Sequence, residues 1–96
     1  MRFEWDPEKD KANQSKHSLS FSEASELFLG GSDYLEIFDE SHSIGEDRFI
    51  AIGVVRRGTI VVVWTERGEE VIRIISARMA TKREQQHHRQ FMESMQ

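Results

Sequence analysis

Residues 59–76 read Thr-Ile-Val-Val-Val-Trp-Thr-Glu-Arg-Gly-Glu-Glu-Val-Ile-Arg-Ile-Ile-Ser. The runs Thr59–Thr65 and Val71–Ser76 are rich in β-branched residues, which favour strands. A short polar segment that contains Gly68 separates the two runs. Two such runs joined by a glycine-containing loop are typical of a β-hairpin. We therefore predict that this hairpin forms the central part of a β-sheet.

Further stretches outside the hairpin have the patterns of apolar residues that indicate strands. Arg48–Val55 carries apolar residues on both faces, which indicates a strand near the middle of the sheet. Tyr34–Phe38 is expected to add at one edge, and Phe3 and Trp5 alternate with polar neighbours in a short strand. Short turns between the three successive strands from Arg48 onward predict an antiparallel meander.

Two helices are predicted between the first short strand and Tyr34. Asp6 and Pro7 form a helix start, because Asp accepts hydrogen bonds from free backbone N–H groups and Pro is well suited to the first helical position. This polar helix should run from Pro7 to about Lys16. Ser20 begins a capping box for a second helix, which Gly30-Gly31 ends.

A third helix is predicted after the last strand. Thr81 and Glu84 fit a second capping box, and no helix-breaking residue follows to the end of the chain. The predicted fold is therefore α+β, with an antiparallel sheet, two N-terminal helices and a C-terminal helix.

Length and composition predict one domain that spans residues 1–96, because a chain of 96 residues supports one modest core. The chain has no cysteine, which excludes disulfides and thiolate metal sites. No apolar run approaches the length of a membrane span, and the N-terminus does not resemble a signal peptide. We therefore expect a cytoplasmic protein with no membrane partner.

The charge is distributed unevenly along a chain whose formal net charge is -4. Residues 1–48 hold 5 Lys or Arg and 12 Asp or Glu, whereas residues 49–96 hold 8 and 5. The negative total disfavours direct DNA binding, and the sequence offers no recognition helix. The asymmetry predicts that an anionic partner would meet the C-terminal half, or that acidic helices pack beside a basic sheet.

Arginine residues recur in and around the hairpin. Arg73 interrupts the second run, Arg67 lies in the turn and Arg78 follows the strand, so we expect the three to converge near one end of the sheet. A guanidinium group suits phosphate because its planar fork donates paired hydrogen bonds. Each arginine can instead lie along the sheet and pair with a carboxylate, and the pattern alone leaves both interpretations open.

Glu46 and Arg48 lie two residues apart at the start of a strand, where they can share a face. They form either a structural ion pair or a base beside an anion-binding group. The four histidines have no spacing typical of a metal site, and no nucleotide-binding loop occurs. We therefore expect neither a metal nor a cofactor.

Motifs in order over nearly the whole chain resemble the BrnT family of toxins from bacterial type II toxin–antitoxin systems. The most specific are Thr65-Glu66-Arg67-Gly68 and the run Arg73–Arg78. The other matching residues are Phe3-Glu4-Trp5-Asp6, Asn13, Lys16-His17, Phe21, Ala24, Phe28, Gly45-Glu46, Arg48, Gly53, Ala80 and Glu84. One departure is Ser18, because the family usually has Gly after Lys-His.

The resemblance implies a RelE-like fold and a ribonuclease that cuts RNA, arrests translation and slows growth. It also implies a BrnA-like antitoxin with a ribbon-helix-helix region, and the pair would bind promoter DNA only as a complex. The alternative is a non-catalytic protein-binding module, or a decayed toxin that acts only in a regulatory complex with its partner.

RNA cleavage by attack of the 2′-hydroxyl on the adjacent phosphate requires a base, cations and an acid, but no metal. For the ribonuclease, the candidate phosphate-binding residues are Arg67, Arg73 and Arg78, with Arg48 as a fourth. Glu46 or His17 would be the base, and Lys16 would assist.

Overall fold

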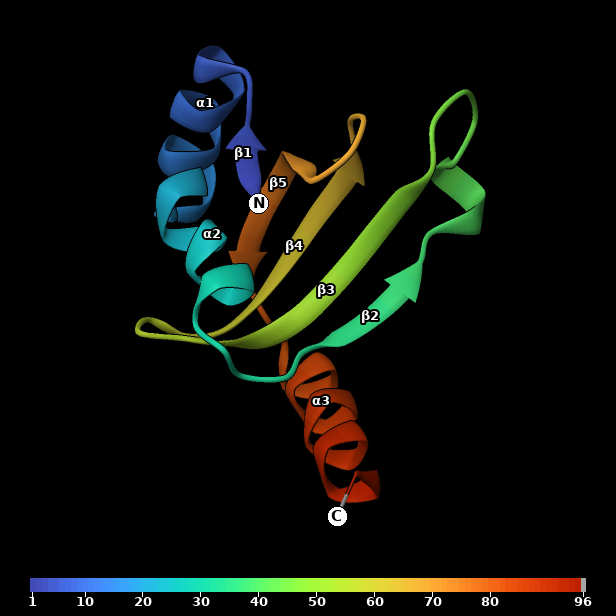
Figure 1. Ribbon diagram of the computed structural model, residues 1–96. Helices are drawn as coiled ribbons and strands as arrows, with labels where there is room; N and C mark the ends of the chain where they lie inside the picture. Colours follow the sequence, from blue (N-terminus) through green and yellow to red (C-terminus); the bar gives the residue numbers. More distant parts are fainter. Residues whose placement is uncertain (96) are drawn as a thin grey trace.

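The computed structural model describes residues 1–95, so Gln96, the last residue of the predicted domain, lies outside the described residues. Figure 1 shows two helices beside a twisted sheet and a third helix beyond its far end. The strands are β1 (Arg2–Glu4), β2 (Leu35–Phe38), β3 (Arg48–Val55), β4 (Gly58–Glu66) and β5 (Val71–Met79). The helices are α1 (Pro7–His17), α2 (Phe21–Leu29) and α3 (Lys82–Ser94), and η1 (Glu40–His42) is a short 3-10 turn.

The sheet has the strand order β1-β5-β4-β3-β2. Its four strands from β2 to β5 form the predicted antiparallel meander, with β2 at one edge. The expectation of a purely antiparallel sheet is wrong for β1, which pairs with β5 in parallel. A parallel pair needs a long crossover, and the chain from α1 through β4 supplies it. The α+β fold class is confirmed.

The predicted capping signals are present at all three helix starts. Asp6 accepts a hydrogen bond from the backbone N–H of Glu8 and precedes Pro7. Ser20 and Thr81 each form a complete capping box with the glutamate three residues later. Each box satisfies backbone N–H groups that have no partner inside the helix, and so fixes where α2 and α3 begin.

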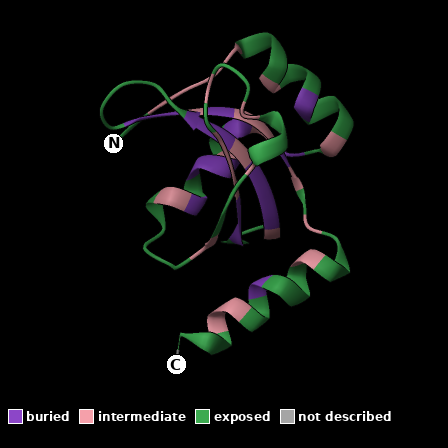
Figure 2. Ribbon diagram, turned by 90° about the vertical axis from the view of Figure 1, so that its right-hand side faces the viewer, coloured by how far each residue is buried: buried purple, intermediate pink, exposed green. Residues whose placement is uncertain are grey.

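The main core lies between the sheet and the N-terminal helices. Buried residues of α2, including Phe21, Ala24 and Leu27, pack on the inward-facing residues of β3, β4 and β5. Gly53 makes the close approach possible, because a Cβ atom there would lie 2.9 Å from the Cβ of Tyr34 and would collide with Leu27. Figure 2 shows that burial concentrates in the strands and α2, whereas α3 is mostly exposed.

A β-bulge in β5 changes which residues face the core. Val63 pairs with Ser76 but Trp64 pairs with Ile74, so Ile75 has no partner on β4. Simple alternation would place Ser76 on the same face as Ile72 and Ile74, but Ala77 takes the buried position instead. The extra residue also brings Arg73 and Arg78, five positions apart, to the same outer face.

Asn13 completes the hydrogen bonding of β5 where β1 has ended. Its side-chain amide donates to the backbone oxygens of Ala77 and Leu19, each at 2.8 Å, and its carbonyl accepts from the N–H of Ala77 at 3.2 Å. Asn13 is 8% exposed, so these bonds form away from water. One side chain thus joins α1, the segment before α2 and the edge of β5.

Replacing Asn13 with alanine should lower the free energy of unfolding by about 2–4 kcal/mol, because buried backbone groups would lose their partners. Urea unfolding of the purified chain measures this change. Gln14→Ala is the matched control on the exposed side of α1 and should change stability by less than about 0.5 kcal/mol. Equal effects of the two substitutions would contradict the structural role of Asn13.

Candidate active site

A row of polar side chains crosses the outer face of the sheet near its open end. Thr65 of β4 pairs with Arg48 of β3 on one side and Arg73 of β5 on the other, and Arg73 pairs with Glu4 of β1. Cross-strand partners project from the same face, and strands lie about 4.8 Å apart. The backbones of Arg48 and Arg73 are therefore roughly 10 Å apart, with Thr65 between them.

Glu46 lies between two guanidinium groups. Its carboxylate is 3.6 Å from Nε of Arg48 and 3.8 Å from a terminal nitrogen of Arg67. Both distances allow charge attraction but are too long for hydrogen bonds, and Nε of Arg48 is buried without a hydrogen-bond partner. The two arginines therefore retain donors for an additional anion.

Arg73 forms an ion pair and hydrogen bond with Glu4. Its side chain is 28% exposed and that of Glu4 is 43% exposed, so the pair is accessible to a ligand. A guanidinium group has more donors than one carboxylate contact uses, which leaves Arg73 able to bind a second anion. Arg48, Arg67 and Arg73 thus collect around one end of the outer face.

The expected convergence of three arginines is wrong for Arg78. Arg67 precedes β5 and Arg78 is next to its last residue, so the two lie at opposite ends of the strand. Arg78 pairs with Val61, four residues along β4 from Thr65, which corresponds to roughly 13 Å. Its guanidinium donates to both carboxylate oxygens of Glu84, at 2.7 and 2.8 Å, and so attaches α3 to the sheet.

This bidentate pair should make stability depend on pH. The Arg78 hydrogen bonds, helped by the backbone N–H of Thr81, lower the pKa of Glu84 from 4.5 to about 2. Because the folded-state pKa lies below the unfolded one, the stabilisation is complete above about pH 4.5 and is lost as pH falls toward 2. Solvent screening of a pair in which Arg78 is 41% exposed reduces the expected loss to about 1–2 kcal/mol.

Chemical unfolding at pH 6 and pH 3 measures this pH dependence. The loss of unfolding free energy between pH 6 and pH 3 should be smaller for Glu84→Gln than for the parent chain, by about 1–2 kcal/mol. Glu93→Gln, an exposed substitution on the same helix, should behave as the parent does. An identical pH dependence for parent and Glu84→Gln would exclude Glu84 as the titrating group.

Lys16 and His17 do not join the arginine row. They end α1, one turn after Asn13, whose amide binds Ala77 near the C-terminal end of β5. The expected role of His17 as base, with Lys16 assisting, therefore has no support in the geometry. Ser18 follows with φ 57°, the left-handed conformation that glycine adopts without strain.

A hollow of about 400 Å³ adjoins Glu46 at the end of the sheet. The loop residues Gly45 and Asp47 line it, together with Thr65 and Glu66 of β4. Thr65 is 2% exposed, and its hydroxyl donates to the backbone oxygen of Asp47 at 2.6 Å. Thr65 thus fixes the loop that carries Glu46 against the row of arginines.

Sequence reasoning missed Glu4 and Thr65 as parts of this site. Glu4 lies far from Arg73 in the sequence, and only the parallel pairing of β1 with β5 places it there. Alternation along β4 would have placed Thr65 on the same face as Arg73, once the hairpin register was known.

Comparison with known proteins identifies the family. Residues 5–84 match the sequence model of a family described as the ribonuclease toxin BrnT of type II toxin–antitoxin systems. The chain belongs to this family. The match contains every residue of the arginine row except Glu4, and it ends in the first turn of α3.

A solved structure of a BrnT ribonuclease toxin, from Brucella abortus, has the same fold as this BrnT-family chain. The TM-score is 0.67 at 28% sequence identity, and the alignment covers 85% of this chain and 99% of the Brucella chain. A search among curated proteins gives no match. Within residues 1–95, no helix has the length and apolarity needed to cross a membrane, and no three His, Asp or Glu side chains form a group that could hold a metal ion.

Proposed function

We propose that this BrnT-family chain is an endoribonuclease that cleaves RNA without a metal ion, by attack of a 2′-hydroxyl on the adjacent phosphate. The single observation that carries the proposal is the grouping of Arg48, Arg67 and Arg73 around Glu46 and Thr65. This grouping provides cations for an RNA phosphate and a carboxylate within reach of them. The family description as a ribonuclease toxin supports the same chemistry.

Glu46 is the proposed base. It takes the proton from the 2′-hydroxyl, the 2′-oxygen forms a bond to phosphorus, and the bond between phosphorus and the 5′-oxygen breaks. The leaving 5′-oxygen takes a proton from water or from a protonated side chain. The products are a 2′,3′-cyclic phosphate and a 5′-hydroxyl, so atoms and charge balance.

The three arginines stabilise the charge that develops on phosphate. Donors that already surround the position of the developing charge lower the barrier without further reorganisation. In the absence of RNA, Glu4 and Glu46 neutralise part of the positive charge, and a phosphate would replace these contacts at the guanidinium groups.

The biological consequence that we propose is arrest of translation and growth, controlled by a BrnA-like antitoxin with a ribbon-helix-helix region. Membership of a type II toxin–antitoxin family supports an antitoxin partner. Promoter DNA would then be contacted through the antitoxin complex.

The direct test is incubation of the purified chain with single-stranded RNA in buffer that contains EDTA. We expect cleavage products that end in a 2′,3′-cyclic phosphate, and no cleavage of an RNA with 2′-deoxyribose at the cleavage site. Loss of activity on addition of EDTA, with recovery on addition of Mg²⁺, would overturn the metal-independent mechanism. Cleavage of the deoxy substrate would overturn the 2′-hydroxyl attack.

The second candidate function is a non-catalytic module that acts only by binding its partner. The observation that favours it is that Arg67, Arg73 and Arg78 each already have a carboxylate partner. The same incubation decides between the two, because a binding module would leave the RNA intact at every protein concentration.

A further inference from the structure

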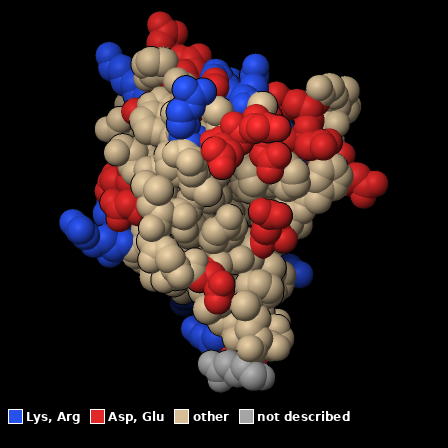
Figure 3. Space-filling view, viewed as in Figure 1, with Lys and Arg blue, Asp and Glu red and all other residues tan. Residues whose placement is uncertain are grey.

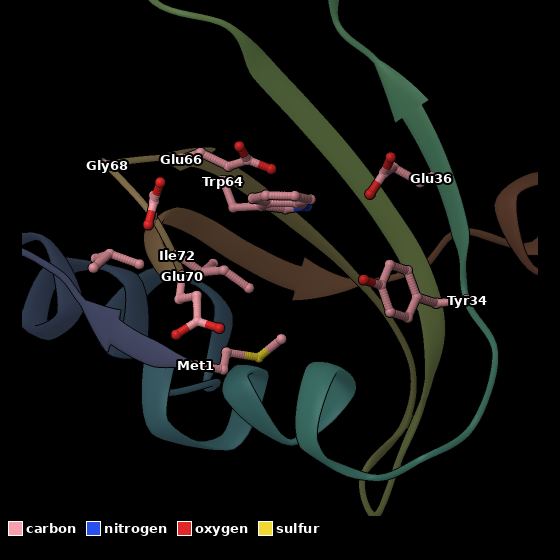
Figure 4. A pocket seen from close by; sticks show the side chains of 10 residues that line it. Met1, Tyr34, Glu36, Trp64, Glu66, Gly68, Glu70 and Ile72 are labelled. Carbon is pink, nitrogen blue, oxygen red and sulfur yellow. The ribbon is translucent and has the colours of Figure 1, made fainter.

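A cavity lies on the helix side of the sheet, on the opposite face from the arginine row, and it shares Glu66 and Gly68 with the hollow beside Glu46. It has a volume of about 640 Å³, and Trp64 and Ile72 form its floor. Figure 4 shows Tyr34 on one side of this cleft and Met1 on another, with Trp64 between the surrounding carboxylates.

The cleft is strongly acidic. Four glutamates line it, and none of its lining residues within the described part of the chain is Lys or Arg. The four are Glu36, Glu66, Glu69 and Glu70. Glu66, Glu69 and Glu70 come from the end of β4 and the following turn, and Glu36 comes from β2. Figure 4 shows Glu36 on the opposite side of the cleft from Glu66 and Glu70. Figure 3 shows acidic side chains gathered on this face of the molecule.

The negative charge of the cleft also acts on Tyr34. Burial, and then the charge of Glu36, raise the pKa of the Tyr34 hydroxyl above its usual value of 10.0. An RNA or DNA phosphate would be repelled by the same charge, because like charges in a partly desolvated site oppose binding.

Trp64 supplies an independent indication of a ligand. It is 4% exposed, and its indole N–H has no hydrogen-bond partner. Figure 4 shows the indole nitrogen at the end of the ring that faces Tyr34 and Glu36 across the cleft. Buried N–H groups are nearly always paired, so this donor lacks an acceptor that a ligand could provide.

We propose that the cleft binds a segment of the protein antitoxin that carries arginine or lysine side chains. Cationic side chains would pair with the glutamates, and a peptide carbonyl oxygen could accept from the Trp64 N–H. The half-buried Tyr34 also offers its aromatic ring to a cation, which is a favourable contact. Carboxylates on separate walls suit a polypeptide with several spaced cations better than one small ion.

The inference rests on the antitoxin partner in the proposed function, but its test does not use RNA cleavage. The probe is a fluorescent, end-blocked hexapeptide of alternating arginine and alanine, titrated with the whole chain and followed by anisotropy. The test variant is Glu36→Gln with Glu70→Gln. The matched control is Glu8→Gln with Glu93→Gln, which makes the same change in net charge at exposed positions outside the cleft.

We expect the test variant to bind the peptide about tenfold more weakly than the parent, because two charge pairs are lost. The control variant should bind as the parent does. Trp64→Phe should weaken binding further by removing the N–H donor, and a glutamate–alanine peptide should not bind. Thermal melting of each variant confirms that it is folded.

Equal binding to parent, test and control variants would overturn the proposal, since only overall charge would then matter. The proposal would also fail if the parent and the control variant bound single-stranded RNA or Mg²⁺ and the test variant did not. The cleft would then serve another ligand. If the test variant binds the peptide weakly but cleaves RNA as the parent does, the cleft and the active site are separate. A chain that binds the peptide but never cleaves RNA would defeat the proposed activity and leave the cleft intact.

Discussion

Replacing Arg73 with alanine should lower the rate of RNA cleavage on the order of 100-fold or more, because one preorganised donor to the developing charge is removed. Arg73 lies on β5 between its cross-strand partners Thr65 and Glu4. Single-turnover kinetics with a short single-stranded RNA measures the chemical step. Arg73→Lys should restore only part of the rate, because lysine lacks the planar fork.

Two control variants make this result specific. Arg56→Ala removes an exposed arginine from the turn between β3 and β4 and should leave the rate unchanged. Arg78→Ala should destabilise the chain through loss of the Glu84 contact, yet cleave at the parental rate at temperatures where it remains folded. A loss of rate in folded Arg78→Ala equal to that in Arg73→Ala would contradict a site confined to the Arg48–Arg73 row.

RNA binding by the same variants should change with salt in a defined way. Each phosphate contact to a single strand contributes about 0.7 to the slope of log affinity against log salt concentration. Arg73→Ala should therefore flatten that slope by about 0.7, and Arg56→Ala should leave it unchanged. Identical slopes for parent and Arg73→Ala would mean that Arg73 does not contact phosphate.

Replacing Glu46 with glutamine should reduce kcat by about 10²–10⁴-fold, the usual contribution of a positioned base. The Michaelis constant should stay the same or fall, because loss of the carboxylate frees Arg48 and Arg67 for RNA phosphate. A purely structural Glu46 would give a different result, with weaker RNA binding and lower stability. This split between kcat and KM therefore distinguishes a base from an ion-pair partner.

The matched control for Glu46→Gln is Glu40→Gln, an exposed glutamate in the same loop region. It makes the same charge change and should leave both kinetic constants unchanged. If Glu46→Gln retains the parental kcat while it remains folded, another group takes the proton from the 2′-hydroxyl.

Local signals in the sequence predicted most of the elements. The bounds of β3 agree with the predicted Arg48–Val55, and the capping boxes at Ser20 and Thr81 fix two helix starts. These features depend on residues close together in the chain. The pairing of β1 with β5 and the bulge at Ile75 depend on contacts between distant segments, for which the sequence pattern contained no signal.

The candidate site was predicted only in part, because some of its contacts join segments that are distant in the chain. The neighbours Glu46 and Arg48 do lie together, and Arg67 joins them across the end of the sheet. Arg78 was misplaced because Arg67 precedes β5 and Arg78 is next to its last residue, so the length of the strand separates the two. The carboxylate partners of Arg73 and Arg78 come from β1 and α3 and could not be inferred from spacing.

The unpaired Ile75 determines which face of the sheet each later residue of β5 occupies. If Ile75 instead paired with a residue of β4, strict alternation would rotate every later side chain of β5 to the opposite face of the sheet. Ala77 would leave the apolar layer and a charged guanidinium would enter it, while α3 would lose its anchor. A chimera that keeps the length of this strand must therefore also keep the bulge.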